Sequence, residues 1–450
     1  MKIAVIGLGK IGLPLAVQYA TKGHDVVGID VSQSVVDVVN RGRVPFPGEA
    51  FLDVKLAATV DAGLFTATTD YGSGLAGCDA IVVVVPLFVD EEARPDFGWM
   101  DAATESIAAN LPRGALVAYE TTLPVGTTRE RWAPRLEAGS GLVEGIDFDV
   151  VFSPERVLTG RVFADLRRYP KLVGGLTPEG AARGVEFYES VLDFDERDDL
   201  PRKNGVWDLG TAEAAEMAKL AETTYRDVNI GLANEFARYA EKVGVDVQGV
   251  IEACNSQPYS HIHSPGIAVG GHCIPVYPRL YLWNDPDATI VRAARARNAG
   301  MPHHAVDLLA RLHGDLAGQT VLVLGAAYRG GVKETAFSGV FDTVRALESA
   351  GADVVVHDPM YKRDELARLG LTAAVRGDAA DAVIVQADHA DYRSWTDADV
   401  PGVRTVVDGR RLLDAARWAG CAYVAIGGIP TGAAPAGSMP SDAADALIGA

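Results

Sequence analysis

The sequence predicts an α/β protein in which two doubly wound domains are joined by a long central helix. Three observations lead to this prediction. Short apolar segments alternate with helical patterns over residues 1–205, a helix-favouring run without proline crosses the middle of the chain, and the alternation restarts near residue 318. A chain of 450 residues is too long for a single core, so two or three domains are expected.

The composition excludes several classes of partner. Hydrophobic residues make up 48% and charged residues 22%, as in ordinary globular proteins, and the net charge of −19 opposes binding to nucleic acid or to an anionic membrane. The longest apolar run, residues 80–89, is too short to span a bilayer and contains a proline. The chain enters a strand at once, so no signal peptide is expected, and its four scattered cysteines suit a reducing cytoplasm.

The first domain is predicted over residues 1–205. An apolar run, three glycines and the apolar-periodic segment 13–23 indicate a strand, a tight turn and a helix. A second strand, "DVVGID", ends at Asp30. Further buried strands of a parallel sheet are expected in "DAIVVVVP", "ALVAYETT" and "FDVVFSPER".

A helix of some 30 residues is predicted from Thr211 to Val243, with Thr211 as N-cap and Gly244 as C-cap. It would be roughly 45 Å long at ~1.5 Å per residue. Helices of this length commonly link domains or form oligomer interfaces. We therefore expect residues 206–305 to be a helical linker and homodimerisation region that also carries a cysteine loop.

A second doubly wound domain is predicted over residues 306–430. "QTVLVLGAAYRGG" indicates a strand and a glycine turn, "FDTVRALESAGA" a helix, and "DVVVHDP", "DAVIVQAD" and "TVVDGR" further strands. Residues 431–450 are biased toward Ala, Pro, Gly and Ser and are expected to form a flexible tail.

The first glycine turn indicates a dinucleotide site. Gly7, Gly9 and Gly12 follow a strand and open a helix, and Asp30 ends the next strand, 18 residues after Gly12. The three glycines allow the tight turn, the approach of a pyrophosphate and the packing of helix on strand. Asp30 can accept from ribose hydroxyls and repels a 2′-phosphate, so NAD is expected rather than NADP. The alternative is a glycine-rich turn in an empty domain.

The expected cofactor site lies in a Rossmann-like first domain and consists of the turn and two later strand ends: Gly7, Gly9, Lys10, Ile11, Gly12, Asp30, Pro86 and Thr122.

"GIAVGGHCIPVYP", residues 266–278, places Cys273 after two glycines and before two prolines, a pattern that favours a functional thiol over packing. On the long helix, i, i+4, i+7 spacing puts Lys219, Thr223 and Arg226 on one face. The alternatives are a solvated charged face for these residues and a small buried hydrophobe for the cysteine. The other three cysteines, Cys78, Cys254 and Cys421, are interpreted as small buried hydrophobic residues.

A metal site would require the histidines near the cysteine. The candidate ligands are His261, His263, His272 and Cys273. Their spacing fits no common zinc pattern, and the adjacent pair cannot easily turn to one ion. No metal is expected.

Several motifs occur in one order across about residues 1–430: the glycine fingerprint, "ETTLPVGTT", "SPERVLTGR", "AKLAETTYRDVNI", "GGHCIPV" and "VVDGR". Together they resemble the UDP-glucose/GDP-mannose dehydrogenase family of nucleotide-sugar 6-dehydrogenases. "SPERVLTGR" and "GGHCIPV" are similar to the branch that acts on UDP-N-acetylhexosamines. The resemblance implies oxidation of the C6 alcohol of a nucleotide sugar to the acid with two NAD. The implied substrate is a UDP-sugar, either a UDP-N-acetylhexosamine or a UDP-hexose, whose nucleotide binds in the second domain, and the implied assembly is a homodimer through the central helix.

The resemblance also implies roles for individual residues. Cys273 corresponds to the nucleophile that captures the C6 aldehyde as a thiohemiacetal and then carries the thioester. Lys219 corresponds to a lysine that stabilises the developing oxyanion, Glu155 to a carboxylate used in thioester hydrolysis, and Thr122 to a threonine that holds the catalytic water. The implied substrate contacts are Arg156, Lys219, Tyr259, Gly266, Gly270, Gly271, Tyr328 and Lys333.

Four positions depart from the family pattern. Thr223 and Tyr277 stand where an asparagine and an aspartate are usual, which bears on proton handling. Tyr259 and Ala336 replace two arginines associated with the nucleotide. Thr223 and Tyr277 can still donate hydrogen bonds, so both are kept as catalytic candidates. The alternatives are a two-electron dehydrogenase that stops at the aldehyde and a non-catalytic protein that binds a nucleotide sugar.

Overall fold

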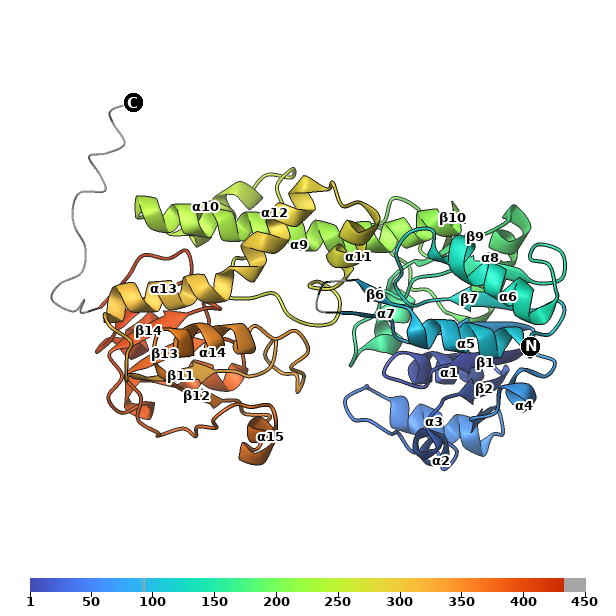
Figure 1. The fold of residues 1–450 in the computed structure, drawn as a ribbon, viewed down its shortest axis with the longest axis horizontal. Helices are drawn as coiled ribbons and strands as arrows, with labels where there is room; N and C mark the ends of the chain where they lie inside the picture. The colour runs from blue at the N-terminus through green and yellow to red at the C-terminus, as the bar shows by residue number, and fades with distance from the viewer. Residues whose placement is uncertain (91, 93, 433–450) are drawn as a thin grey trace. The chain divides into compact units, whose positions relative to one another are not determined.

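The computed structural model describes residues 1–90, 92 and 94–432 of the chain. The predicted α/β class, with two Rossmann-like sheets and a long central helix, is confirmed (Figure 1). The chain forms two compact units: Met1–Glu222 together with Arg279–Pro286, and Thr223–Pro278 together with the residues from Asp287 onward. From residue 433 onward, the predicted flexible tail lies outside the described residues.

The first unit is built on an eight-stranded sheet with the order β10-β9-β8-β7-β4-β1-β2-β3. Its strands are β1 (Lys2–Ile6), β2 (Asp25–Ile29), β3 (Phe65–Thr68), β4 (Ala80–Val83), β7 (Leu116–Tyr119), β8 (Asp149–Phe152), β9 (Lys171–Gly175) and β10 (Val206–Thr211). The strands from β8 to β3 are parallel, whereas β9 runs antiparallel to β8 and parallel to β10. A separate ribbon pairs β5 (Phe88–Val89) with β6 (Pro95–Asp96).

Helices cover both faces of this sheet, as a doubly wound fold requires. They are α1 (Gly12–Thr21), α2 (Gln33–Val39), α3 (Leu52–Asp61), α4 (Tyr71–Leu75), α5 (Gly98–Ala108), the π-helical turn η1 (Thr128–Trp132), α6 (Ala133–Ser140), α7 (Val162–Arg168) and α8 (Pro178–Val191). One core joins α1, α3, α7 and α8 to the sheet, and a second joins α4, α5 and α6 to its other face. The central strands are apolar throughout because both of their faces are buried: all four residues of β4 and of β7 are buried.

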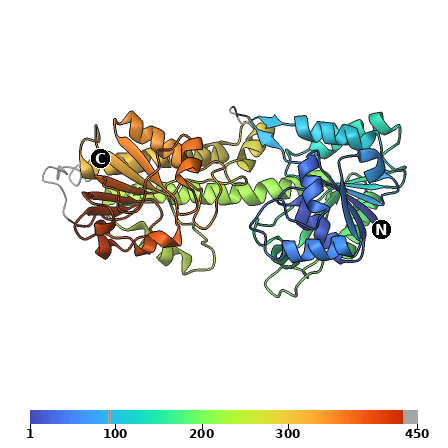
Figure 2. The same cartoon turned by 90° about the horizontal axis from the view of Figure 1, so that it is seen from below.

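Helix α9 (Ala212–Val243) has 32 residues and appears as one uninterrupted helix in Figure 2. Both predicted caps are present. The amide N–H of Ala214 donates to Thr211 Oγ1 over 3.2 Å, and Gly244 takes the left-handed conformation with φ of +69°. Among the described residues, no helix has the length and apolar character needed to cross a bilayer.

The second unit contains a parallel five-stranded sheet with the order β12-β11-β13-β14-β15. Its strands are β11 (Thr320–Leu324), β12 (Asp353–His357), β13 (Ala382–Val385), β14 (Thr405–Asp408) and β15 (Ala422–Ala425). Its further helices are α10 (Val247–Asn255), α12 (Thr289–Ala299), α13 (Met301–His313), α14 (Val340–Ser349) and α15 (Arg363–Arg368), and α11 (Tyr277–Asn284) begins there and continues into the first unit.

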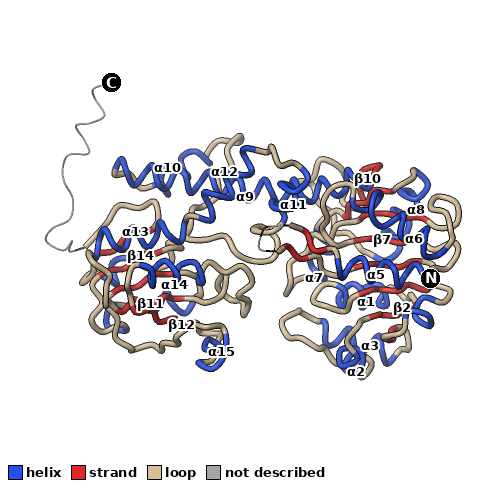
Figure 3. Tube along the Cα trace, in the orientation of Figure 1, coloured by secondary structure: helices blue, strands red, loops and turns tan. Residues whose placement is uncertain are grey.

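The two faces of the second sheet are covered differently. Helices α10, α13 and α14 pack on one face. The other is covered by aromatic side chains and by the short 3₁₀ segments η2 (Ala390–Ser394), η3 (Asp397–Asp399) and η4 (Ala415–Trp418). Figure 3 shows α13 and α14 beside the strands of this sheet. The prediction of a second doubly wound domain is confirmed, although no long helix among the described residues packs on the second of these two faces.

Candidate active site

The strand register brings the predicted cofactor residues to one edge of the first sheet. Ile6 pairs with Ile29 and with Val83, and Val83 pairs with Tyr119, so β1, β2, β4 and β7 all end at the same edge. The order of the sheet reverses between β1 and β4, which is where doubly wound proteins bind their ligands.

The three glycines have the conformations that the fingerprint predicts. Gly7 has φ of +93°, and its amide N–H donates to the Ile29 carbonyl over 2.8 Å. A Cβ on Gly12 would lie 1.8 Å from the Gly7 carbonyl oxygen, whereas a Cβ on Gly9 would meet nothing within 4 Å. The turn is therefore closed where helix and strand pack and open at Gly9, where a phosphate would approach.

Asp30 is held against this turn. Its Oδ2 accepts from the amide of Leu8 over 2.8 Å, and its Oδ1 accepts from the amide of Ser32 over 2.9 Å. Helix α1 begins at Gly12 without a side-chain cap, although the amide of Leu13 already donates to the Gly9 carbonyl over 3.1 Å. The open position at Gly9, the uncapped helix and the fixed carboxylate fit a bound NAD.

The other predicted cofactor residues lie around the same edge. Lys10 and Pro86 are exposed, Ile11 is partly buried against the core, and Thr122 is buried. The neighbouring Thr121 donates from Oγ1 to the Val85 carbonyl over 2.6 Å and so ties the end of β7 to the segment after β4.

A buried charged cluster lies at the ends of β7 and β8. Lys171 Nζ lies 2.8 Å from Glu120 Oε2 and 2.9 Å from Glu155 Oε2. Glu120 Oε1 also accepts from the phenols of Tyr188, over 2.7 Å, and Tyr19, over 3.3 Å. The exposed fractions of the three charged side chains are 4% for the lysine, 0% for Glu120 and 11% for Glu155.

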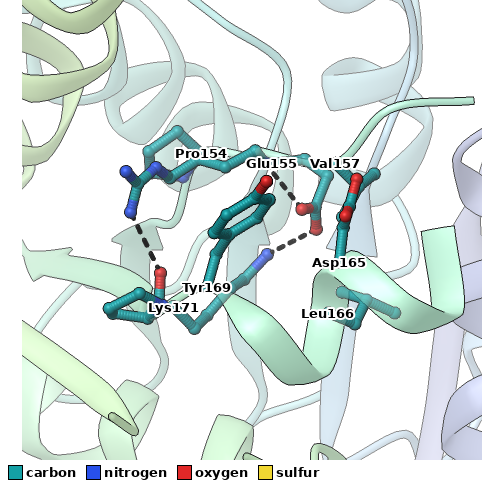
Figure 4. A pocket seen from close by; sticks show the side chains of 9 residues that line it. Pro154, Glu155, Val157, Asp165, Leu166, Tyr169 and Lys171 are labelled. Carbon is teal, nitrogen blue, oxygen red and sulfur yellow. Dashed lines mark hydrogen bonds and ion pairs between the residues drawn. The ribbon is translucent and has the colours of Figure 1, made fainter. Parts of the chain in front are cut away.

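Glu155 and Lys171 of this cluster border a pocket, whereas Glu120 does not line it. The pocket is lined by residues 154–157, 165–166 and 169–171, and Figure 4 shows Glu155 and Lys171 turned toward each other on its wall. The Glu155 Oε1 accepts from the amide of Arg156 over 2.6 Å. Burial raises the pKa of Glu120 to about 7, and Lys171 lowers the pKa of Glu155 against the effect of its own burial.

Lys219 is buried, so the solvated-face alternative is wrong for this residue, whereas Arg226 is exposed. Lys219 Nζ donates to the Glu155 backbone carbonyl over 2.7 Å. The Arg156 guanidinium forms two 3.1 Å hydrogen bonds to the carboxylate of Glu222 on α9. The structure therefore brings Glu155, Arg156 and Lys219 close together, after the end of β8 and on α9.

The loop that carries Thr122 is tied to α9 by a buried carboxylate. Glu216 accepts from the amides of Gly126 and Thr128, over 2.6 and 2.9 Å, and from the Thr128 hydroxyl over 2.6 Å. Burial raises the pKa of Glu216 to about 7. These bonds hold the loop against the first turns of the helix that carries Lys219.

The second unit contains Cys273, Thr223 and Tyr277. The Cys273 side chain is exposed, and its Sγ lies 3.8 Å from the phenol oxygen of Tyr277. Cys78 and Cys421 are buried, as predicted for small buried hydrophobic residues, and burial raises the pKa of each thiol to about 11. Cys254 departs from that prediction because it is only partly buried.

A hydrogen-bonded network of mostly buried polar side chains supports the loop that carries Cys273, residues 266–278 (the cysteine loop). Asn234 accepts from the amide of Gly266 over 2.9 Å and donates to Asn298, which donates in turn to the Asp227 carboxylate over 2.8 Å. Arg295 bonds to the same carboxylate over 2.7 Å and donates to the Ile274 carbonyl over 3.4 Å. The network therefore holds the loop both at its start and immediately after the cysteine.

The two glycines before the cysteine pack against the segment that follows β11. A Cβ on Gly270 would lie 2.5 Å from Tyr328 Cβ, and Gly271, with φ of +91°, would meet the Tyr328 ring at 3.1 Å. The Gly271 amide donates to the Ala336 carbonyl over 3.0 Å. The loop thus uses the backbone of Ala336, where the family's arginine side chain is absent.

Lys333 and Tyr259 are the remaining predicted substrate residues. Lys333 forms 2.7 and 2.8 Å hydrogen bonds to the carboxylate of Glu365, and Tyr259 is 93% exposed.

Arg410 of "VVDGR" was not predicted as a site residue. It donates to the Gln386 carbonyl over 2.9 Å and to the Tyr328 carbonyl over 3.3 Å. Within the described part of the chain, no group of three or more His, Cys, Asp or Glu side chains could hold a metal ion.

Sequence reasoning also missed Glu120 and Lys171. The only available signals were a glutamate two residues before Thr122 and a lysine at the start of an apolar strand.

Three consecutive parts of the chain match the UDP-glucose/GDP-mannose dehydrogenase family. Residues 1–192 match its NAD binding domain, residues 213–299 its central domain, and residues 322–415 its UDP binding domain.

Relatives align over most of their length. The chain is 36% identical to UDP-N-acetyl-D-mannosamine dehydrogenase of Pyrococcus horikoshii over 92% of this chain and 96% of that protein. It is 32% identical to NDP-N-acetyl-D-galactosaminuronic acid dehydrogenase of Ralstonia nicotianae, over 92% and 97% of the two chains. Among solved structures, the UDP-D-ManNAc dehydrogenase of Pyrococcus horikoshii superimposes with a TM-score of 0.84 at 34% identity, covering 95% of this chain and 99% of that chain.

Proposed function

The chain belongs to the UDP-glucose/GDP-mannose dehydrogenase family, and from this premise we propose that it oxidises C6 of a UDP-N-acetylhexosamine, with UDP-N-acetylmannosamine as the preferred substrate. It is an NAD-dependent nucleotide-sugar dehydrogenase that converts the C6 alcohol to the uronic acid. The substrate proposal is supported by several relatives named UDP-N-acetyl-D-mannosamine dehydrogenase, at 31–36% identity.

Cys273 is the proposed nucleophile. An aldehyde has no good hydride to donate until a nucleophile adds to it, so the thiolate adds to C6 and forms a thiohemiacetal. Oxidation of that adduct leaves a thioester on the sulfur. Bound NAD, held by the glycine turn and Asp30, supplies the hydride acceptor. The observation that carries this proposal is the free, exposed thiol on the "GGHC" loop, with a phenol 3.8 Å away.

Glu155 is the proposed base for thioester hydrolysis. Its carboxylate borders a pocket and is kept ionised by Lys171, so it can take a proton from the attacking water. Thr122 is proposed to hold that water, and Lys219 to stabilise the oxyanion at C6. The burial of Lys219 supports its role, because a charge in a water-poor site acts more strongly on a developing anion.

Tyr277 is proposed to replace the usual aspartate beside the thiol. The Cys273 thiol donates to the phenol oxygen over 3.8 Å, and the backbone amide of Tyr277 donates to the Cys273 carbonyl over 2.9 Å. The phenol can therefore stabilise the thiolate and the alkoxide of the thiohemiacetal by donating to them. Thr223, which is buried on α9, is proposed to donate in place of the usual asparagine.

We propose that the chain forms a homodimer through α9. Five large apolar side chains of this helix are between 36% and 65% exposed and recur at intervals of seven, four, three and four residues: Tyr225, Leu232, Phe236, Tyr239 and Val243. That spacing places them along one stripe of the helix, as in a helix–helix interface. Replacing Phe236 with glutamate should convert the dimer to a monomer in sedimentation analysis, and an unaltered mass would contradict this interface.

The substrate is tested with purified enzyme and a panel of UDP-N-acetylmannosamine, UDP-N-acetylglucosamine, UDP-glucose and GDP-mannose. We expect the highest kcat/KM with UDP-N-acetylmannosamine, and Cys273→Ser should bind that sugar without turning it over. A preference for UDP-glucose or GDP-mannose would contradict the substrate proposal. The free thiol also favours a reducing compartment such as the cytoplasm, where we propose that the enzyme acts.

A further inference from the structure

We propose that Lys171 and Glu120 are positioning residues that hold the Glu155 carboxylate ionised and fixed at the wall of its pocket. The inference rests on the proposed role of Glu155 as the hydrolytic base. It concerns three charged side chains from three strand ends: Glu120 follows β7, Glu155 follows β8, and Lys171 begins β9.

The antiparallel edge of the sheet makes this cluster possible. Strand β9 runs against β8, so its first residue lies at the edge where β7 and β8 end. A lysine placed there reaches both carboxylates, with nitrogen–oxygen distances of 2.8 and 2.9 Å. A regular parallel strand would have placed its last residue, not its first, at that edge.

The environment of Glu120 differs from that of Glu155. Glu120 is fully enclosed and accepts two phenolic hydroxyls as well as the ammonium. Glu155 retains some solvent exposure and accepts from the backbone amide of Arg156. The cluster contains two carboxylates and one ammonium, so it carries one excess negative charge that a single proton removes. The enclosed carboxylate takes that proton first, which leaves the charge on Glu155.

Burying these charges is costly, which argues against a merely structural role. An apolar residue at the start of β9 would extend a strand that is otherwise fully buried, and such replacements of buried ion pairs are often neutral or stabilising. What the buried charges provide is a base, the Glu155 carboxylate, that stays ionised beside a pocket.

Other titratable groups surround Glu155 and bear on its titration. Lys219 on α9 donates to its backbone carbonyl, Asp165 on α7 and Tyr169 line the same pocket, and Tyr19 on α1 and Tyr188 on α8 reach the cluster through Glu120. Lys171 contacts the Glu155 carboxylate directly (Figure 4), and the Glu120 side chain is hydrogen-bonded to it as well.

The test is the pH dependence of thioester hydrolysis. Hydrolysis needs ionised Glu155, so the rate falls as the pH drops through the pKa of Glu155. An ammonium close to a carboxylate lowers its pKa by about 1–3 units, so Lys171→Met should move this acid limb upward by about 1–3 pH units. Lys171→Arg should move it back toward the wild-type position. The initial burst of NADH, which precedes hydrolysis, should keep its amplitude in both variants.

Glu120→Gln tests where the shared proton resides. If Glu120 already holds it, replacement by the neutral amide should leave the acid limb within about 0.5 pH unit of the wild type. The double variant Lys171→Met, Glu120→Gln leaves no unpaired carboxylate in the enclosed position, and it should show the same upward shift if the single variant fails to fold. Lys22→Met, which removes a surface ion pair with Asp193 in the same unit, is the control and should change nothing.

Glu155→Gln separates this inference from the proposed function. Normal hydrolysis in Glu155→Gln would remove Glu155 from the mechanism, whatever Lys171 does. Slow hydrolysis in Glu155→Gln together with an unshifted acid limb in Lys171→Met and in the double variant would overturn the positioning role. A downward shift of a unit or more in Glu120→Gln would place the proton on Glu155 and would overturn the role of Glu120.

Discussion

Replacing Arg295 with methionine tests how the cysteine loop is supported. The guanidinium lies 2.7 Å from the Asp227 carboxylate, and the two side chains are 14% and 0% exposed. Removing the arginine leaves a buried carboxylate without its cation, which typically destabilises a protein by ~3–5 kcal/mol. The same change removes the hydrogen bond to the Ile274 carbonyl, next to Cys273. A cysteine loop held less firmly should lower kcat, and a tenfold fall would correspond to ~1.4 kcal/mol of lost transition-state stabilisation.

The assay is amide hydrogen exchange of α9 and α12, which reports the local free energy of opening in the second unit. Arg297→Met is a matched control on the same helix, because Arg297 pairs with Glu235 at 2.6 Å but the two side chains are 28% and 56% exposed. The Arg297→Met variant should lose less than ~1 kcal/mol of this local opening free energy. Equal losses in the two variants, or a double variant of Arg295→Met with Asp227→Asn whose losses simply add, would refute this account of the network.

Three further predictions concern the site itself. Asp30→Ala should narrow a preference for NAD over NADP, and equal activity with both cofactors in the unmutated protein would remove Asp30 from cofactor selection. Iodoacetamide should label Cys273 ahead of the other three cysteines, and Cys273→Ser should abolish acid release while NAD binding persists; labelling elsewhere first, or undiminished acid, would contradict the nucleophile assignment. Tyr277→Phe should lower turnover by about 10²-fold if its phenol handles a proton, whereas a wild-type rate would leave the departure from aspartate unexplained.

The features that sequence analysis predicted are those set by local backbone chemistry. The positive φ of Gly7, the contact that excludes a side chain at Gly12, and the caps at Thr211 and Gly244 each depend on residues a few positions apart, or on one strand–turn–helix unit. The parallel strands were recognisable because both of their faces are buried and their sequences are continuously apolar.

The features that were missed depend on distant pairs. Glu120 and Lys171 are 51 residues apart, and Asp227 and Arg295 are 68 apart, so neither pairing has a local signature. Lys171 reaches its partners only because β9 reverses direction, and nothing in its own segment predicts that reversal. The packing of Gly270 against Tyr328, in the segment after β11, likewise depends on a contact between residues far apart in the sequence.

The stoichiometry of NADH produced per sugar tests the central claim most directly. A limiting amount of UDP-N-acetylmannosamine is incubated with excess NAD, NADH is followed by its absorbance, and the sugar product is identified by mass spectrometry. Oxidation of the alcohol to the acid through a thioester on Cys273 predicts two NADH per sugar and a C6 carboxylate. One NADH per sugar with a free aldehyde would contradict the four-electron mechanism and would leave Cys273 without its proposed role.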